Sequence, residues 1–447
     1  MITAEVGQFV TGFRLPDAPA ELKAVARRHI VDSLGVMLAG KAEHAAVLAL
    51  RHAQVMSGAQ LAPPLFAFLL GIRGHVLDYD DTQLSPRPEG VYGLLTHPSV
   101  PVLAAGLAIG RWEGATGADL LEAFLAATEV ECRLADAIGQ RHYREGFHSG
   151  GTIGCLAAAL VAARLLDLDE DKTRVALGIA ASSAAGLREN FGTMTKPLHI
   201  GRAAQHGVEA AYLAHAGWTA SIDVLDARFG FYRAFGGEVD EGLVVGQLGN
   251  PWYYLKPGVA IKPHPSDALT HPAMSVMSRL IQDHDLHAEE IEKVTVGVNS
   301  HVPDALVHHR PRNAQAARFS MEYAMATLLA RRRAGIAEYT RGSVDAPAVQ
   351  MLIPRVELRP DPAADSAGPH RMLSRVTVLL RDGRVISGNG DAARGHPNNP
   401  MTEEEVLAKF RDCAMWSGRA DGAANILGMV EHLEELESLD ELCHALL

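Results

Sequence analysis

The feature of this 447-residue sequence that most constrains its fold is a succession of alanine-rich segments whose apolar residues recur every three or four positions. This spacing places apolar side chains along one face of an α-helix, and that face has to be buried against another element. The clearest segments are 20–34, 65–72, 102–109, 119–138, 153–166 and 172–183. We therefore expect the first half of the chain to fold as packed helices.

The character of the chain changes near Pro251, where residues 252–265 are interrupted by prolines. Beyond this point, residues 291–298 and 374–380 alternate between apolar and polar side chains, as half-buried strands do. The second of these strands runs into a predicted hairpin turn at 381–384, and helices are expected at 271–281 and 321–332. Residues 400–447 return to a helical pattern, which begins with a capping box at Thr402 and Glu405. A smaller α+β unit is therefore predicted between two helical stretches.

Composition narrows the classes of function. A formal net charge of −12 and the lack of a basic stretch argue against nucleic-acid binding. No apolar run approaches the roughly 20 residues that span a bilayer, and the first residues do not resemble a signal sequence. The four cysteines are far apart and form no metal-binding or disulfide pattern, so we expect buried thiols. These observations predict a cytoplasmic protein with no membrane or nucleic-acid partner.

A polar loop at 190–199 runs directly into an apolar helix. Proline is favoured as the first helical residue, so Pro197 predicts that Lys196 is the last residue before the helix. A cation is poorly matched to the positive end of a helix unless an anion lies between them, so we interpret this loop as an anion site. The alternative is a lysine that points into solvent.

His97 and His148 occupy the same kind of position as Lys196, in a loop just before a long apolar helix. If the three helices pack side by side, their N-terminal ends bring two imidazoles, one ammonium and several free N–H groups to one cavity. A small polycarboxylate would suit such a cavity. The alternative is that each histidine only forms local hydrogen bonds.

Three aspartates, Asp78, Asp80 and Asp81, lie within four positions. Carboxylates this close repel one another unless cations, helix ends or solvent stabilise them. We favour a hydrogen-bonding scaffold over a metal site, because no metal-ligand histidine spacing accompanies them.

Six motifs together make the chain similar to the MmgE/PrpD family over nearly its whole length. They are 74–82 (Gly-His-Val-Leu-Asp-Tyr-Asp-Asp-Thr), 96–99 (Thr-His-Pro-Ser), 146–148 (Gly-Phe-His), 190–199, 261–265 (Ile-Lys-Pro-His-Pro) and 318–323 (Arg-Phe-Ser-Met-Glu-Tyr). The resemblance implies a mainly α protein with a large all-helical domain, 1–258 and 396–447, and an inserted α+β lid, 259–395. It also implies a homodimer that needs no metal or organic cofactor.

The resemblance further implies which residues form the active site. Carried over by motif, they are Asp78, Thr82, His97, His148, Lys196, Lys262 and Tyr323, and we add His199 and Asp267 as substrate-binding residues. Asp267 is a departure, because family members often carry a histidine or cysteine there, so a proton donor is altered. The loop from Gln83 to Leu95 is also longer than usual, which changes the mouth of the pocket.

Reactions of this family form a carbanion-like centre beside a carboxylate. Lys196 and Lys262 supply positive charge, which is the kind of preorganised electrostatic stabilisation that usually dominates catalysis. His97 and His148 are the acid/base candidates, with Asp78 orienting or tuning one of them and Tyr323 supplying a hydroxyl.

The resemblance favours a hydro-lyase of the 2-methylcitrate dehydratase type acting on a small di- or tricarboxylate, because dehydration is the activity most widely attached to the family. An epimerase or racemase of a dicarboxylate, of the iminodisuccinate epimerase type, and a decarboxylase of the cis-aconitate type are the alternatives. A non-catalytic helical dimer is a remote alternative, because a scaffold has no need for buried cations and histidines, whose desolvation costs free energy.

Overall fold

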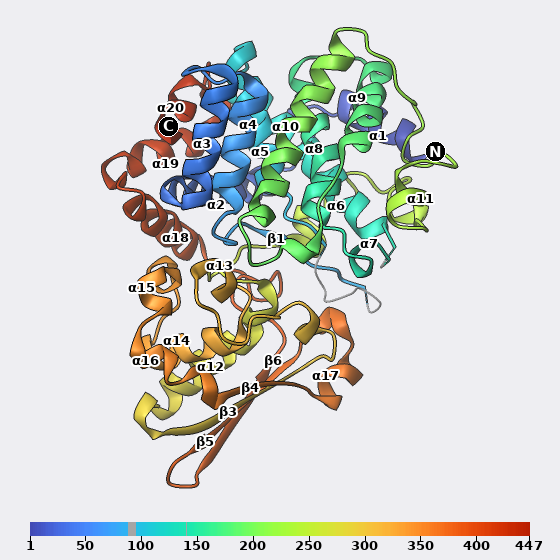
Figure 1. Cartoon of the computed structure of the whole chain (residues 1–447). Helices are drawn as coiled ribbons and strands as arrows, with labels where there is room; N and C mark the ends of the chain where they lie inside the picture. Colours follow the sequence, from blue (N-terminus) through green and yellow to red (C-terminus); the bar gives the residue numbers. More distant parts are fainter. Residues whose placement is uncertain (88–94, 140) are drawn as a thin grey trace.

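The computed structural model describes residues 1–87, 95–139 and 141–447. Figure 1 shows a large helical region, to which the C-terminal helices return, and a smaller α+β region beside it. The main helices of the large region are α1 (Ile2–Gly12), α2 (Ala20–Ala39), α3 (His44–Ser57), α4 (Pro63–His75), α5 (Ser99–Glu113), α6 (Gly117–Ala137), α8 (Ser149–Leu165), α9 (Glu170–Ser183), α10 (Thr195–His215), α18 (Glu403–Trp416), α19 (Ala423–Glu431) and α20 (Asp440–Leu446). The short helices α7 (Arg141–Arg144) and α11 (Phe231–Phe235) complete it.

Small residues let the central helices of this region approach closely. A Cβ atom added to Gly71 of α4 would lie 2.9 Å from the Cα atom of Gly201 in α10, and one added to Gly207 of α10 would lie 2.5 Å from Ala158 in α8. Larger residues at these glycines would push the helix axes apart. The close packing brings the C-terminal end of α4 beside the N-terminal ends of α8 and α10, and this is where the site forms.

The C-terminal helix α18 is anchored to the N-terminal half by a buried ion pair. The Lys409 ammonium lies 2.6 Å from the Asp32 carboxylate of α2 and donates to the Tyr79 carbonyl at 2.7 Å. All three partners are buried. The C-terminal stretch therefore completes the helical core and also fixes the backbone next to Asp78.

The α+β region is built on a four-stranded sheet in the order β4-β3-β5-β6. Its strands are β3 (Ile291–Val298), β4 (Val356–Pro360), β5 (Ser374–Leu380) and β6 (Val385–Gly390), and its helices are α12 (His271–His284), α13 (Ala314–Ala317), α14 (Met321–Arg331), α15 (Arg341–Val344), α16 (Pro347–Gln350) and α17 (Pro362–Ala367). Strand β3 pairs parallel with β4 and antiparallel with β5, with Val294 opposite Val356 and Val378. In β5, buried residues alternate with more exposed ones, as its sequence predicts.

Two hydrophobic cores correspond to these two regions. The first runs from α1 to Ile261, includes Ile336 and resumes near α18, whereas the second lies mainly between Leu269 and Ile386. A two-stranded ribbon of β1 (Thr82–Gln83) and β2 (Val259–Ala260) joins the regions, with Thr82 opposite Ala260. The mainly α fold is thus confirmed, and the two cores are our reason for proposing domain boundaries at 258/259 and 395/396.

The predicted helices and the two predicted strands are present, and Thr402 and Glu405 form the predicted capping box. One boundary was predicted wrongly: α10 begins at Thr195, so Lys196 lies inside its first turn and Pro197 is the third helical residue. Strand β4 was not predicted, because its five residues are too few to establish a pattern. All four cysteines are buried free thiols.

Within the described residues, no single helix is long and apolar enough to cross a bilayer, although one pair bent by 84°, Ala20–Ala42 with His44–Ser57, meets the length and composition limits.

Candidate active site

The site is a pocket at the junction of the two regions, where three helices begin. Helix α5 starts at Ser99, just after His97, helix α8 starts at Ser149, just after His148, and α10 contains Lys196 in its first turn. The pocket is lined by Thr82, Leu95, Thr96, His97, Tyr143, His148, Ser149, Gly150, Phe191, Lys196 and Asp267. The structure therefore places His97, His148 and Lys196 on one small cavity. Residues 88–94 of the longer loop lie outside the described residues.

Two buried lysines, of which Lys196 lines this pocket, share one carboxylate. The Asp78 Oδ1 atom accepts hydrogen bonds from Nζ of Lys196 and Nζ of Lys262, each at 2.8 Å. Lys262 also donates to the Asp78 carbonyl at 3.2 Å. Burial alone would raise the pKa of Asp78, but the two ammonium groups hold it well below its usual range. One negative charge thus holds two cations together, and the cluster favours a further anion.

The backbone at Asp78 explains how one side chain reaches both lysines. Asp78 follows the C-terminal end of α4 and has a φ of 51°, in the left-handed region. Its N–H donates to the His75 carbonyl at 3.0 Å, which closes a tight turn after the helix. The turn directs the chain away from α4 and leaves the carboxylate facing α10.

Two aromatic rings also contact the Lys196 ammonium. Its Nζ lies 5.1 Å from the centroid of Phe191 and 4.9 Å from that of Phe319. Such cation–π contacts stabilise a desolvated ammonium. Lys196 is buried, so the alternative of a lysine pointing into solvent is wrong.

His97 and His148 face each other across the pocket, with ring centroids 6.4 Å apart. His97 Nδ1 lies 2.7 Å from the Asp81 carbonyl, and His148 Nδ1 lies 3.1 Å from Nδ1 of His199. Burial lowers the pKa of His97 to about 3, and burial followed by the Lys196 charge holds the pKa of His148 well below the histidine range. Both rings are therefore neutral in the free site near pH 7.

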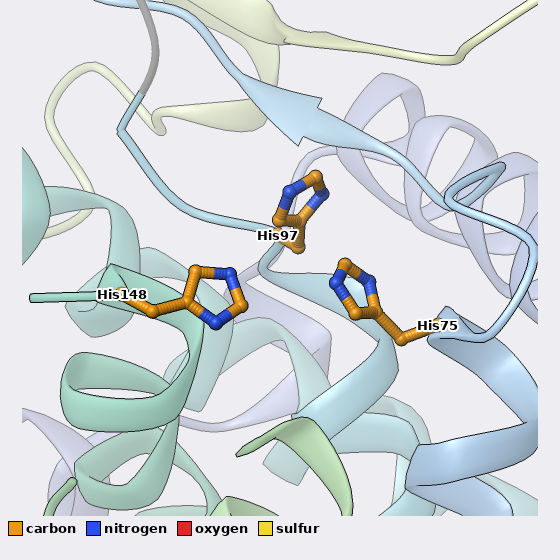
Figure 2. Close-up of side chains that lie close together, drawn as sticks. All are labelled: His75, His97 and His148. Carbon is orange, nitrogen blue, oxygen red and sulfur yellow. The ribbon is translucent and has the colours of Figure 1, made fainter. Parts of the chain in front are cut away.

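A third histidine, His75, belongs to the same cluster, although we did not single it out from the sequence. Its ring centroid lies 4.8 Å from that of His97 and 5.7 Å from that of His148, and Figure 2 shows the three imidazoles close together. Its Nδ1 contacts Asp80 Oδ2 at 2.8 Å. The signal was present in the sequence, because His75 lies in the same 74–82 motif as the three aspartates.

The three aspartates have separate partners. Asp78 binds the lysines, Asp80 binds His75 and lies 3.7 Å from His97 Nδ1, and Asp81 accepts a hydrogen bond from the Ser99 N–H at 3.2 Å. This supports the scaffold interpretation for Asp81. It also shows that Asp80, rather than Asp78, contacts the site's histidines.

Two sets of side chains have the spacing of metal ligands. In each set, one ligand atom from every residue lies within 4.8 Å of the others, and the sets are His75, His97 and His148, and His75, Asp78 and Asp80. In the set that contains Asp78 and Asp80, both carboxylates are already bonded to lysines or a histidine. In the set of three histidines, ring nitrogens are available as metal ligands.

Of the remaining predicted site residues, the structure places some in the pocket lining and others outside it. Thr82 and Asp267 line the pocket, and Asp267 Oδ1 also accepts the Leu269 N–H at 2.9 Å. Burial and then the Asp78 charge raise the pKa of Asp267. Tyr323 is not among the described residues that line the pocket, and its hydroxyl donates to the Glu338 carbonyl inside the second core. A direct hydroxyl contribution from Tyr323 would require that bond to break.

Two family models match the chain and together cover most of it. Residues 4–242 match the MmgE/PrpD N-terminal domain, and residues 264–435 match the MmgE/PrpD C-terminal domain. The junction between the two matches falls next to Lys262, where the chain passes from the first core to the second.

Three curated relatives match over most of the chain. The cis-aconitate decarboxylase of Homo sapiens is 29% identical over 465 aligned positions, which cover 99% of this chain and 93% of the relative. The enzyme of the same name from Mus musculus is 29% identical, covering 94% of this chain and 88% of the relative. The cis-aconitate decarboxylase of Aspergillus terreus is 27% identical, covering 77% of this chain and 72% of the relative.

Proposed function

Because the chain belongs to the MmgE/PrpD family, we propose that it is a lyase that removes CO₂ from a small unsaturated tricarboxylate of the cis-aconitate class. The observation that carries the proposal is the pair of ammonium groups, Lys196 and Lys262, that share Asp78 beside His97 and His148. The printed activity of the relatives supports decarboxylation better than the dehydration that the sequence analysis placed first, and gives no support to an epimerase.

The charge of the pocket fits the difficult step of such a reaction. When the C–C bond to the departing carboxylate breaks, its electron pair stays on the carbon framework beside a second carboxylate. The ammonium of Lys196 stabilises the charge that spreads onto that carboxylate, and the site needs little reorganisation because Phe191 and Asp78 already hold the cation in place.

The carbon that keeps the electron pair then needs a proton. His97 donates its Nδ1–H to a carbonyl, so in its neutral form its Nε2 carries a lone pair and accepts. His148 shares a proton with His199 through their Nδ1 atoms. A doubly protonated His148 can give up its Nε2 proton to carbon and remain neutral, still bonded to His199. Substrate carboxylates beside Lys196 offset the charge that lowers the pKa of His148, so substrate binding favours this donor state.

The test is proton NMR of the purified protein in D₂O with cis-aconitate, citrate, 2-methylcitrate and a dicarboxylate such as tartrate. Loss of CO₂ with a deuterium-labelled, itaconate-type product supports the proposal. New vinylic signals from citrate or 2-methylcitrate would instead restore the hydro-lyase interpretation, and exchange with inversion at one carbon would restore the epimerase. Sedimentation of the same sample tests our proposal of a homodimer.

A further inference from the structure

The three imidazoles of His75, His97 and His148 lie close together (Figure 2), and each has its Nδ1 atom engaged by another residue. We propose that they form a binding site for a divalent transition-metal ion such as Zn²⁺, and that the ion inhibits the enzyme by occupying the acid/base histidines. Metal binding stands on the geometry alone, whereas its inhibitory effect rests on the proposed function.

The arrangement behind the rings is the one that metal-binding histidines use. A ligating histidine commonly donates its second ring nitrogen to a carboxylate or carbonyl, which fixes the ring and makes the ligating nitrogen more basic. The partners of the Nδ1 atoms are the Asp80 carboxylate for His75, the Asp81 carbonyl for His97 and Nδ1 of His199 for His148.

The free nitrogens lack partners of their own. Nε2 of His75 and Nε2 of His148 are buried and have no hydrogen-bond partner among residues 1–87, 95–139 and 141–447. Buried polar atoms are normally satisfied, so two unpartnered nitrogens beside one another indicate a ligand between them. A metal ion would satisfy both.

The spacing is close to that of a zinc site. Zn–N bonds of about 2.0–2.1 Å place tetrahedral ligand nitrogens roughly 3.3 Å apart. One ring nitrogen of each histidine lies within 4.8 Å of the corresponding nitrogens of the other two, so movements of about 1 Å and small ring rotations complete the triad. His97 and His148 also line the pocket, which gives an ion a route in and leaves its fourth position open to water or a substrate carboxylate.

The charge of the surroundings tolerates a cation. Lys196 and Lys262 are each bonded to Asp78, and Asp80 lies against His75 and near His97, so these four charged groups sum to zero. A divalent ion at the histidines would add two positive charges, of which an anion in its open position offsets one and an ionised Asp267 on the pocket wall offsets the other. Because the ion blocks Nε2 of the proton-transferring histidines, it competes with substrate.

Co²⁺ is the direct probe, because tetrahedral Co²⁺ bound to nitrogen ligands absorbs visible light whether or not the protein turns over a substrate. We expect wild type to bind one equivalent of Co²⁺, Zn²⁺ to displace it, and Zn²⁺ to inhibit with a raised KM. His75→Gln, which can still donate to Asp80, and His97→Gln should each weaken Co²⁺ binding by at least tenfold. His432→Gln, at an exposed histidine, should change nothing.

The outcomes separate the two proposals. Co²⁺ binding that needs His75 and His97, in a protein that decarboxylates no acid, would retain the metal site and remove the proposed function. Turnover of cis-aconitate with no Co²⁺ spectrum and no inhibition by Zn²⁺ would overturn the metal site alone. Binding that survives both ligand substitutions would also overturn it. If His75→Gln fails to fold, Co²⁺ binding by His97→Gln, at a partly exposed histidine, still tests the metal site.

Discussion

The helical side of the pocket and its α+β side are built differently. His75, His97 and His148 come from the helical side, and the ring of each is held by a hydrogen bond to a residue of the same region. Lys262 and Asp267 come from the segment that leads into the α+β side, and Asp267 is a position at which the sequence predicts a departure from the family pattern. On the proposed function, we expect the helical side to set the proton chemistry and the other side to adjust which acid is bound.

Asp78 is the group that both sides share, so removing it is the most severe test of this contrast. Asp78→Ala leaves two buried ammonium groups without their carboxylate, and breaking a buried pair in this way costs about 3–5 kcal/mol. We expect the free energy of unfolding, measured by urea denaturation, to fall by that amount. Asp171→Ala, at a carboxylate 84% exposed, should change it by less than about 0.5 kcal/mol. Equal effects of the two substitutions would show that the lysine cluster is not held by Asp78.

The second test separates catalysis from binding. His148→Gln removes a proton donor of the helical side, so kcat should fall by about 10²–10⁴-fold, while the Kd of the unreactive tricarballylate changes less than about threefold. Lys262→Met removes a cation of the other side, and it should weaken tricarballylate binding by about tenfold or more. Calorimetry gives Kd and the NMR assay gives kcat. If His148→Gln weakens binding as much as Lys262→Met does, the division of labour between the two sides is wrong.

The neutral histidines predict a pH dependence of stability. The folded-state pKa of His97 is about 3, against 6.5 for an ordinary histidine. Between these values the unfolded chain binds a proton that the folded chain does not, so the free energy of unfolding falls as the pH is lowered from about 6.5. His97 contributes up to about 1.4 kcal/mol per pH unit. Urea denaturation between pH 7 and 5 should show a shallower slope for His97→Gln than for wild type or His432→Gln.

The sequence could predict most of the helical side because its signals are local. Apolar periodicity located the helices, and the motifs around His97, His148 and Lys196 lie directly before or within the first turn of a helix, where function and fold coincide. The partners could not be predicted, because they depend on packing. Lys262 and Asp78 are separated by 184 positions in the sequence, so no local pattern predicts the hydrogen bond between them.

Asp80 and Tyr323 show two further limits of sequence reasoning. Three aspartates in one motif are equivalent until the turn after α4 is known, so the contact of Asp80 with His75 was not foreseen. The motif around Tyr323 identified the residue but not the direction of its side chain, which lies in the second core and is bonded to the Glu338 carbonyl.

Asp267 gives the smallest effect and the sharpest test of what the α+β side contributes. Asp267→Asn keeps an oxygen for the Leu269 N–H but removes the negative charge from the pocket wall. At an effective dielectric of about 40, between the values for a protein surface and bulk water, charges roughly 8 Å apart repel by about 1 kcal/mol. We therefore expect Asp267→Asn to bind tricarballylate about fivefold more tightly at pH 7.5.

Because the pKa of Asp267 is raised, tricarballylate binding by wild type should approach that of the variant as the pH is lowered toward 5. The control Asp267→Glu should bind tricarballylate as weakly as wild type does at pH 7.5. If Asp267→Asn instead binds more weakly at every pH, the carboxylate contacts the ligand as an acceptor, and the departure at this position selects for a substrate with a hydroxyl or amino donor.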